Sequence, residues 1–259
     1  MNYTRLLYSV EERICTITLN RPEKRNALDD EFIQELSRAF VSASKDTAIK
    51  VIVLEANGSA FCAGADLDYL QKMSSFNFEE NLEDSKNLMR LFQTMYSMRK
   101  PIIAKVHGPA IAGGCGLATV CDIVVASEEA AFGYTEVKIG FIPAVVLTFL
   151  VRRIGEGKAR SLLLRGDIIS AQQAKELGLV NEIVPAAKLS EEVNAIADSL
   201  CKNSSLLSMG LIKEMFANMD GKTLSDMLEY AANINAVTRM SEDCRKGIAA
   251  FLSKEKIHW

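Results

Sequence analysis

Hydrophobic positions follow two different patterns along the first 185 residues. Short runs of β-branched and apolar residues predict strands, because a strand repeats every two residues and a buried strand is apolar on both faces. Five such runs occur, at residues 14–20, 50–56, 101–106, 122–127 and 131–133. Between and after them lie longer stretches whose apolar residues recur every three or four positions, and these predict helices.

The first predicted helix begins at Asp29 or Asp30, since either carboxylate can cap a first turn. Its apolar stripe consists of Phe32, Ile33, Leu36, Ala39, Phe40 and Ala43. A second amphipathic helix carries Leu88, Leu91, Phe92, Met95 and Met98, and Pro101 follows it. Two more are predicted near 155–165 and 170–178, the latter with Ser170 and Gln173 as a capping box and Gly178 as its stop.

From about Leu189 the pattern is helical to the end of the sequence, with stripes such as Val193, Ile196, Ala197 and Leu200. Strands and helices therefore interleave first, and helices dominate afterwards. This order predicts an α/β fold class. We assign residues 1–190 to the α/β core and residues 191–259 to a C-terminal helical region.

Composition and charge narrow the classes of function. The chain has 259 residues, of which 49% are hydrophobic, so it can bury a substantial core. Its 30 basic and 33 acidic residues give a net charge of −3 without a strong basic field, which disfavours nucleic acid as a partner. The net charge does not exclude a local cluster of basic residues that binds a phosphorylated ligand.

Cysteine usage and hydropathy bear on location. The six cysteines show neither a CxxC pair nor zinc-ligand spacing, and only two histidines are present, so we expect no metal site and a reducing, cytoplasmic environment. The first residues lack the apolar stretch of a signal peptide, and no run approaches the roughly 20 apolar residues of a membrane span. We therefore expect no membrane association.

Two segments share one design, in which a buried strand leads into a loop of small residues and then a helical pattern. They are KVIVLEANGSAFCAGADL (50–67) and PIIAKVHGPAIAGGCGLATV (101–120). Such loops can present free main-chain N–H groups at a helix start, where an anion or a developing oxyanion binds. An alternative is that Gly113, Gly114 and Gly116 only permit close packing of helix and sheet. The sequence does not decide between them.

Glu136 is the candidate acid–base residue. It lies between the strand-like FGY and the apolar segment around IGFIP, so its carboxyl group could sit in a mostly apolar pocket with a raised pKa. The alternative is a surface glutamate paired with Lys138.

These motifs resemble the crotonase superfamily, the enoyl-CoA hydratase/isomerase family. The resemblance rests on NRPEKRNALD (20–29), FCAGADL (61–67), residues 113–122, FGYTEVKIGFIP (132–143) and LRGDIISAQQAKELGLVNEIVP (164–185), in this order. It implies a spiral of ββα units followed by a C-terminal α-helical trimerisation region. It also implies homotrimers, often paired into homohexamers.

The resemblance further implies an acyl-CoA thioester as ligand and assigns the site residues. The main-chain amides of Ala65 and Gly113 would stabilise an enolate, with Glu136 as the acid–base group. Coenzyme A enters as part of the substrate, so no separate cofactor is expected. Predicted substrate-binding residues are Arg25, Ala27, Ala63, Asp66, Leu67, Asp68, Gly114 and Gly116, and Lys24 or Arg25 could meet a CoA phosphate.

The sequence departs from the family pattern at two places. Hydratases of the two-glutamate type carry a glutamate where this chain has Gly116, so one carboxylate, Glu136, must suffice or another group must position the water. The usual glycine-rich segment after the Ile-Pro pair is replaced by residues 144–147, AVVL. This replacement predicts a differently shaped acyl pocket.

The resemblance is greatest to single-glutamate hydratases of the methylglutaconyl-CoA type. We therefore expect an enoyl-CoA hydratase for a short or branched acyl chain, with 3-methylglutaconyl-CoA of leucine breakdown as a candidate. The alternatives are a Δ3,Δ2-enoyl-CoA isomerase and a non-catalytic acyl-CoA-binding homologue.

Overall fold

Two β-sheets organise the protein, whose computed structural model describes residues 3–259. Within these residues the larger sheet has the strand order β1-β2-β3-β4-β6-β9 and the smaller one β5-β7-β8. β1 is antiparallel to β2, and the rest of the larger sheet is parallel. The strands are β1 (Leu6–Glu11), β2 (Ile14–Leu19), β3 (Val51–Ala56), β4 (Ile102–Val106), β5 (Ala110–Ile111), β6 (Ile123–Ser127), β7 (Ala131–Gly133), β8 (Ile168–Ser170) and β9 (Glu182–Val184).

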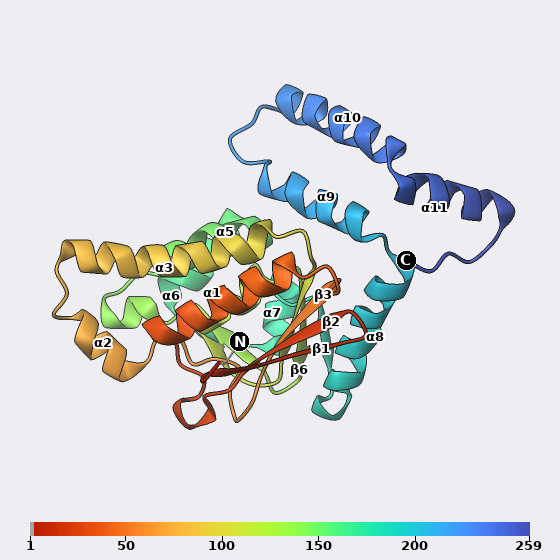
Figure 1. The fold of residues 1–259 in the computed structure, drawn as a ribbon. Helices are drawn as coiled ribbons and strands as arrows, with labels where there is room; N and C mark the ends of the chain where they lie inside the picture. Colours follow the sequence, from red (N-terminus) through yellow and green to blue (C-terminus); the bar gives the residue numbers. More distant parts are fainter. Residues whose placement is uncertain (1–2) are drawn as a thin grey trace.

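Helices cover the sheets and form the C-terminal end of the chain (Figure 1). The α-helices are α1 (Asp30–Lys45), α2 (Leu67–Met73), α3 (Phe78–Ser97), α4 (Gly113–Val120), α5 (Ala144–Ile154), α6 (Glu156–Arg165), α7 (Ala171–Leu177), α8 (Leu189–Asn203), α9 (Leu206–Ala217), α10 (Leu224–Met240) and α11 (Glu242–Ser253). Short 3-10 helices are η1 (Pro22–Lys24), η2 (Glu136–Ile139) and η3 (Ala186–Lys188).

The central strands are buried on both faces because alternate side chains enter two different cores. On β3, Ile52 and Leu54 join the main core, which also contains the apolar stripes of α1 and α3. Val51 and Val53 point the other way, into a smaller core against α8. The near-continuous apolar runs of these strands follow from this double coverage.

The predicted α/β core and its five strands are confirmed. The α1 stripe is buried, and Asp29 rather than Asp30 is the cap, accepting a hydrogen bond from Phe32 N. The capping box of Ser170 and Gln173 and the left-handed Gly178 after α7 are also as predicted. The strands β1, β5, β8 and β9, the helices α2 and α5 and the short 3-10 helices were not predicted.

The C-terminal helices separate into two groups. α8 lies against the sheet, and the boundary between residues 190 and 191 falls inside it. α9 also packs on the core, with Gly210, Leu211 and Lys213 buried and an ion pair of 2.5 Å between Lys213 and Asp122. α10 and α11 have no buried residue and extend away from the core (Figure 1). All six cysteines are free thiols. Among residues 3–259, no helix combines the length and apolarity that crossing a bilayer requires.

Candidate active site

Three extended segments run in parallel toward one cavity. Cys62 pairs with Ala110 in a parallel bridge, and Ala110 pairs in parallel with Phe132 across β5 and β7. Each segment therefore delivers the residues that follow it to the same edge. Three residues beyond Cys62 is Ala65, three beyond Ala110 is Gly113, and four beyond Phe132 is Glu136, which begins η2.

A cavity of about 290 Å³ lies where these segments end. Ala65, Gly113 and Glu136 all line it. Most of the other wall is apolar, from Leu28, Ile33, Ala63, Leu67, Leu70, Met73, Leu88, Ala112, Ile139, Phe141, Ile142, Pro143, Ala144, Val145 and Val146, with Tyr69, Asp84, Ser85 and Thr135 as further polar groups. The structure thus brings the three predicted catalytic residues to one concave, largely apolar site.

Close contact between the first two loops explains part of the glycine cluster. The Ile111 amide donates to Cys62 O at 2.9 Å. A Cβ on Gly114 would lie 2.2 Å from Cys62 O, and one on Gly64 would lie 2.9 Å from the Ala112 Cβ. A Cβ on Gly113 would meet only a Leu28 methyl at 3.5 Å, an ordinary contact. Gly64 and Gly114 are therefore packing glycines, whereas Gly113 adjoins open space.

The amides of Ala65 and Gly113 are placed to serve a ligand. The residues on either side of Ala65 form the main-chain hydrogen bonds to Leu28. Gly64 O accepts from Leu28 N, and Asp66 N donates to Leu28 O. The Ala65 amide of this extended segment therefore points to the other side. Gly113 is the first residue of α4, where an N–H has no acceptor within the helix. Gly113 begins α4, and Ala65 lies just before the N-cap of α2. The N-terminal end of a helix is the end that stabilises negative charge.

Ala112 holds a strained backbone immediately before Gly113. Its φ of 52° and ψ of −125° lie in a region that L-residues rarely adopt. The neighbouring structure enforces this conformation, because the Ala112 amide donates to Gly133 O at 2.7 Å on β7. Strain of this kind costs on the order of 1–3 kcal/mol and concentrates at functional sites.

Glu136 is buried and lacks a hydrogen-bond partner for one carboxyl oxygen. Its side chain is 8% exposed, and its Oε2 atom has no partner among the described residues. Burial raises the pKa of Glu136 above its ordinary value, because desolvation disfavours the carboxylate. The alternative of a surface glutamate paired with Lys138 is therefore wrong. A carboxyl group with a raised pKa binds a proton more readily than an ordinary glutamate, and its free oxygen can take up or release that proton toward a ligand.

Gly114 and Gly116 do not line the cavity, and their contact with substrate stays a prediction. A Cβ on Gly116 would lie 2.7 Å from Val146 and 2.9 Å from the ring of Phe92. The position where two-glutamate hydratases carry their first glutamate is thus filled by apolar side chains of α3 and α5. Glu136 has no second carboxylate at this place.

Of the other predicted substrate-binding residues, Ala63 and Leu67 line the cavity and four do not. Asp66 caps α2 and forms a 2.9 Å ion pair with Arg21, and Asp68 pairs with Lys24 at 2.6 Å. Ala27 is buried. Arg25 is exposed, and its carbonyl accepts from the Ala63 amide at 3.0 Å. Contact of any of these residues with coenzyme A stays a prediction.

Sequence reasoning missed the polar pair on the α2–α3 wall. The Tyr69 hydroxyl donates to Asp84 Oδ1 at 2.5 Å, and both side chains line the cavity. α2 is a short helix without a buried residue, so it leaves no periodic signal. Tyr69 and Asp84 are 15 positions apart in the sequence, and no sequence pattern predicts that they form a hydrogen bond.

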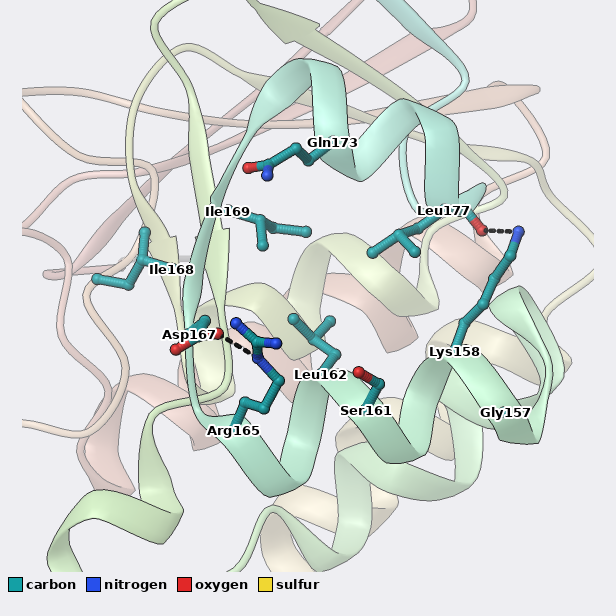
Figure 2. Close-up of a pocket in the computed structure, with 10 residues that line it drawn as sticks. All are labelled: Gly157, Lys158, Ser161, Leu162, Arg165, Asp167, Ile168, Ile169, Gln173 and Leu177. Atoms are coloured by element: carbon teal, nitrogen blue, oxygen red, sulfur yellow. Dashed lines mark hydrogen bonds and ion pairs between the residues drawn. The ribbon is translucent and has the colours of Figure 1, made fainter.

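A larger hollow of about 620 Å³ lies between α6 and the β8–α7 segment (Figure 2). Its charged groups already have partners, since Arg165 pairs with Asp167 at 2.6 Å and Lys158 donates to Leu177 O at 3.0 Å. None of the predicted site residues lines it. The smaller cavity, which Ala65, Gly113 and the Glu136 carboxyl group line together, is the candidate active site.

Over most of its length the chain is similar to known proteins of one family. Residues 9–259 match the family described as enoyl-CoA hydratase/isomerase. A Thermus thermophilus protein provisionally named an enoyl-CoA hydratase is 45% identical over 93% of this chain and 95% of its own length. The 2,3-dehydroadipyl-CoA hydratase of Escherichia coli is 34% identical, with 96% of both chains covered.

Solved structures show the same fold. A Legionella pneumophila protein, provisionally described as an enoyl-CoA hydratase/isomerase (crotonase), superposes with a TM-score of 0.90 at 38% identity and covers 99% of each chain. The fold and the site define a crotonase-like α/β protein. The chain belongs to the enoyl-CoA hydratase/isomerase family of the crotonase superfamily.

Proposed function

We propose that this protein is an enoyl-CoA hydratase that adds water across the α,β double bond of a short or branched enoyl-CoA thioester. The observation that carries the proposal is the convergence on one cavity of Ala65, Gly113 and the buried Glu136 carboxyl group, one oxygen of which has no hydrogen-bond partner among the described residues. Family membership supports the substrate class, because relatives are named as hydratases of enoyl-CoA compounds.

In the proposed reaction, the thioester carbonyl oxygen accepts hydrogen bonds from the two main-chain amides. These bonds strengthen as negative charge develops on that oxygen, so they favour the enolate-like transition state over the ground state. Losing one donor of this type typically costs about 3 kcal/mol of transition-state stabilisation. The chemistry uses only main-chain amides and one carboxyl group, and coenzyme A enters as part of the substrate.

Glu136 acts in both proton transfers. As a carboxylate it accepts a proton from water while the water oxygen bonds to C3, and as an acid it returns a proton to C2 of the enolate. One group serves both steps when water and proton are delivered to the same face of the substrate. The apolar filling of the Gly116 position by Val146 and Phe92 supports this single-carboxylate mechanism.

The cavity dimensions support a short or branched acyl group, since about 290 Å³ bounded largely by aliphatic side chains leaves little room for a long chain. 3-Methylglutaconyl-CoA is a candidate by resemblance to its hydratases. However, the cavity-lining residues include no lysine, arginine or histidine to pair with its terminal carboxylate.

We further propose that the protein works as a homotrimer or a pair of trimers in the cytoplasm. Apolar side chains exposed along α10 and α11 support association of copies of the chain. The six free thiols support a reducing compartment.

Glu136→Gln tests the proposal most directly. Loss of the conjugated thioester's ultraviolet absorbance reports hydration of crotonyl-CoA, and we expect kcat to fall about 1,000-fold or more because both proton transfers are lost. Binding of saturated butyryl-CoA should change by less than a few-fold. The control is Glu129→Gln, which removes an exposed carboxylate outside the cavity. Hydration by the Glu136→Gln variant at the parent rate would contradict the assignment.

Product identification separates the alternatives. A hydratase converts the α,β-unsaturated thioester to the 3-hydroxyacyl thioester, whereas an isomerase would move a proton between C2 and C4 of a β,γ-unsaturated one. Tight binding of acyl-CoA with no product from either substrate would identify a non-catalytic homologue.

A further inference from the structure

The cavity wall formed by α2 and α3 carries a second acidic group, in addition to Glu136. Tyr69 of α2 and Asp84 of α3 both line the cavity, and the Tyr69 hydroxyl donates to Asp84 Oδ1 at 2.5 Å. The donor of this pair is thus already used. What remains for a ligand is the second carboxyl oxygen of Asp84 and the lone pairs of the Tyr69 oxygen, all of them acceptors.

The charges around this wall are of one sign. Among the cavity-lining residues that the structure describes, the ionisable acids are Asp84 and Glu136, and no basic side chain is present. Asp30 is a further nearby carboxylate, whose charge acts on Asp84, and it accepts a hydrogen bond from Asn87 at 3.4 Å. Burial and the nearby Asp30 charge raise the pKa of Asp84, whereas the Tyr69 hydrogen bond opposes this rise and favours the carboxylate form on which the like-charge repulsion depends.

We propose that Asp84, held in place by Tyr69, is a specificity-determining residue that excludes acyl chains ending in a carboxylate. The substrates are then enoyl-CoA thioesters whose acyl group is uncharged, an inference that rests on the proposed hydratase function. A carboxylate entering this cavity would lose its hydration, find no cation and face acceptor atoms. An alkyl terminus would instead contact Leu70, Met73 and Leu88.

This selection has a direct consequence for the candidate substrate. The acyl group of 3-methylglutaconyl-CoA ends in a carboxylate, so Asp84 disfavours it. Hydratases that accept such acyl groups need a cation or a set of hydrogen-bond donors at the distal end of the pocket. This cavity presents the opposite arrangement.

The test compares two substrates that differ only at the end of the chain. These are trans-2-hexenoyl-CoA and trans-2-hexenedioyl-CoA, in which a carboxylate replaces the terminal methyl group. We expect kcat/KM to be at least about 100-fold higher for the uncharged substrate, since like-charge juxtaposition costs several kcal/mol. Asp84→Asn should lower this ratio at least tenfold, and Asp84→Ser serves as a second variant.

One supporting variant and one control isolate the local effect of Asp84. Tyr69→Phe removes the hydroxyl group that holds Asp84 in place and lowers its pKa, so the substrate ratio should fall, but by less than in Asp84→Asn. Glu83→Gln removes a neighbouring charge of α3 that is paired with Arg90 and does not line the cavity, and it should leave the ratio unchanged. A parent ratio near one, or a ratio that Asp84→Asn fails to change, would overturn the inference.

A binding measurement keeps the inference separate from the hydratase function. Calorimetry with saturated hexanoyl-CoA and adipyl-CoA reports selection without turnover. If no enoyl-CoA is hydrated but hexanoyl-CoA still binds more tightly and Asp84→Asn narrows the difference, the proposed reaction is wrong and the role of Asp84 stands. If both saturated compounds bind equally well, the role of Asp84 is rejected.

Discussion

At the residue scale, one position shows how far a sequence resemblance can reach. Gly116 in place of a glutamate is visible in the sequence, and so is the loss of a carboxylate that it implies. The sequence cannot show what fills the vacated volume, because Val146 and Phe92 come from helices 30 and 24 positions away. Their packing against Gly116 turns an absent side chain into a closed apolar wall.

Glu136 is the second case at this scale, and it predicts a cost in stability. Burial raises the pKa of its carboxyl group above the ordinary 4.5, so the folded protein binds this proton more tightly than the unfolded chain. The stability contributed by this group is complete below about pH 4.5 and is lost as the pH rises through the raised folded-state pKa. The residue to which we assign both proton transfers thus destabilises the folded protein as the pH rises.

Glu136→Gln should therefore increase the free energy of unfolding at pH 7, by about 1–3 kcal/mol, because it removes a buried charge with an unsatisfied oxygen. The difference from the parent protein should grow from pH 4.5 upward. Urea unfolding at fixed protein concentration between pH 4 and 8 measures it, with Glu129→Gln as the exposed control. A difference that stays constant over this range would show that Glu136 does not titrate as argued.

At the element scale, prediction succeeded where an element has two chemically different faces. α1 and α3 have long apolar stripes against the main core, and α7 has a capping box and a left-handed glycine. α2 has no buried residue, and the AVVLTFLV segment of α5 is apolar almost without interruption, so neither has a clear helical period. β1 carries only Leu6 as a buried residue. These elements depend on tertiary contacts that spacing does not encode.

The loop around Gly64 lies close to the loop around Ala112, and this contact can be tested by substitution. Gly64→Ala combines a φ of +93° with Cβ contacts of 2.9 Å to Ala112 and 3.0 Å to Ile111 O. Gly178→Ala at the end of α7 has a similar φ of +90° but no atom within 4 Å, so it measures the backbone cost alone. We expect Gly178→Ala to lose about 1–2 kcal/mol of stability and to keep its activity.

Gly64→Ala should lose about 1–3 kcal/mol more than this control, because the loops must separate. The Ala65 amide moves with them, so kcat/KM for crotonyl-CoA should fall at least tenfold, as expected for a donor displaced by a fraction of an ångström or more. Chemical unfolding and the absorbance assay measure the two effects. Equal losses of stability in both variants, with full activity in each, would mean that the loops do not need their close contact.

At the scale of the whole molecule, the order of strands and helices is enough to predict an α/β core with a helical end. The candidate site is less accessible to such reasoning. Its three residues come from positions 65, 113 and 136, and only the parallel pairing of Cys62, Ala110 and Phe132 aligns them. The family resemblance supplied that alignment, whereas periodicity marked only the separate strands. The Tyr69–Asp84 pair has no counterpart in the motifs and emerged from the structure alone.

The C-terminal helices carry the remaining prediction, which concerns assembly. No residue of α10 or α11 is buried, although Leu224, Leu228, Met240, Phe251 and Leu252 are exposed by 62–82%. A monomer rarely leaves so many large apolar side chains in water, so we expect other copies of the chain to cover them. The native mass from light scattering should be three or six times that of one chain.

Leu228→Asp combined with Phe251→Asp should shift the protein toward smaller species, because charges would be buried in the interface without partners. Its midpoint of thermal unfolding should fall and become less dependent on concentration, since association no longer stabilises the fold. Asn233→Asp, at an exposed polar position of α10, adds a similar charge outside the apolar set and should preserve the assembly. A monomeric parent protein, or a doubly substituted one that keeps the full mass, would mean that these helices do not hold the copies together and that their apolar side chains serve another contact.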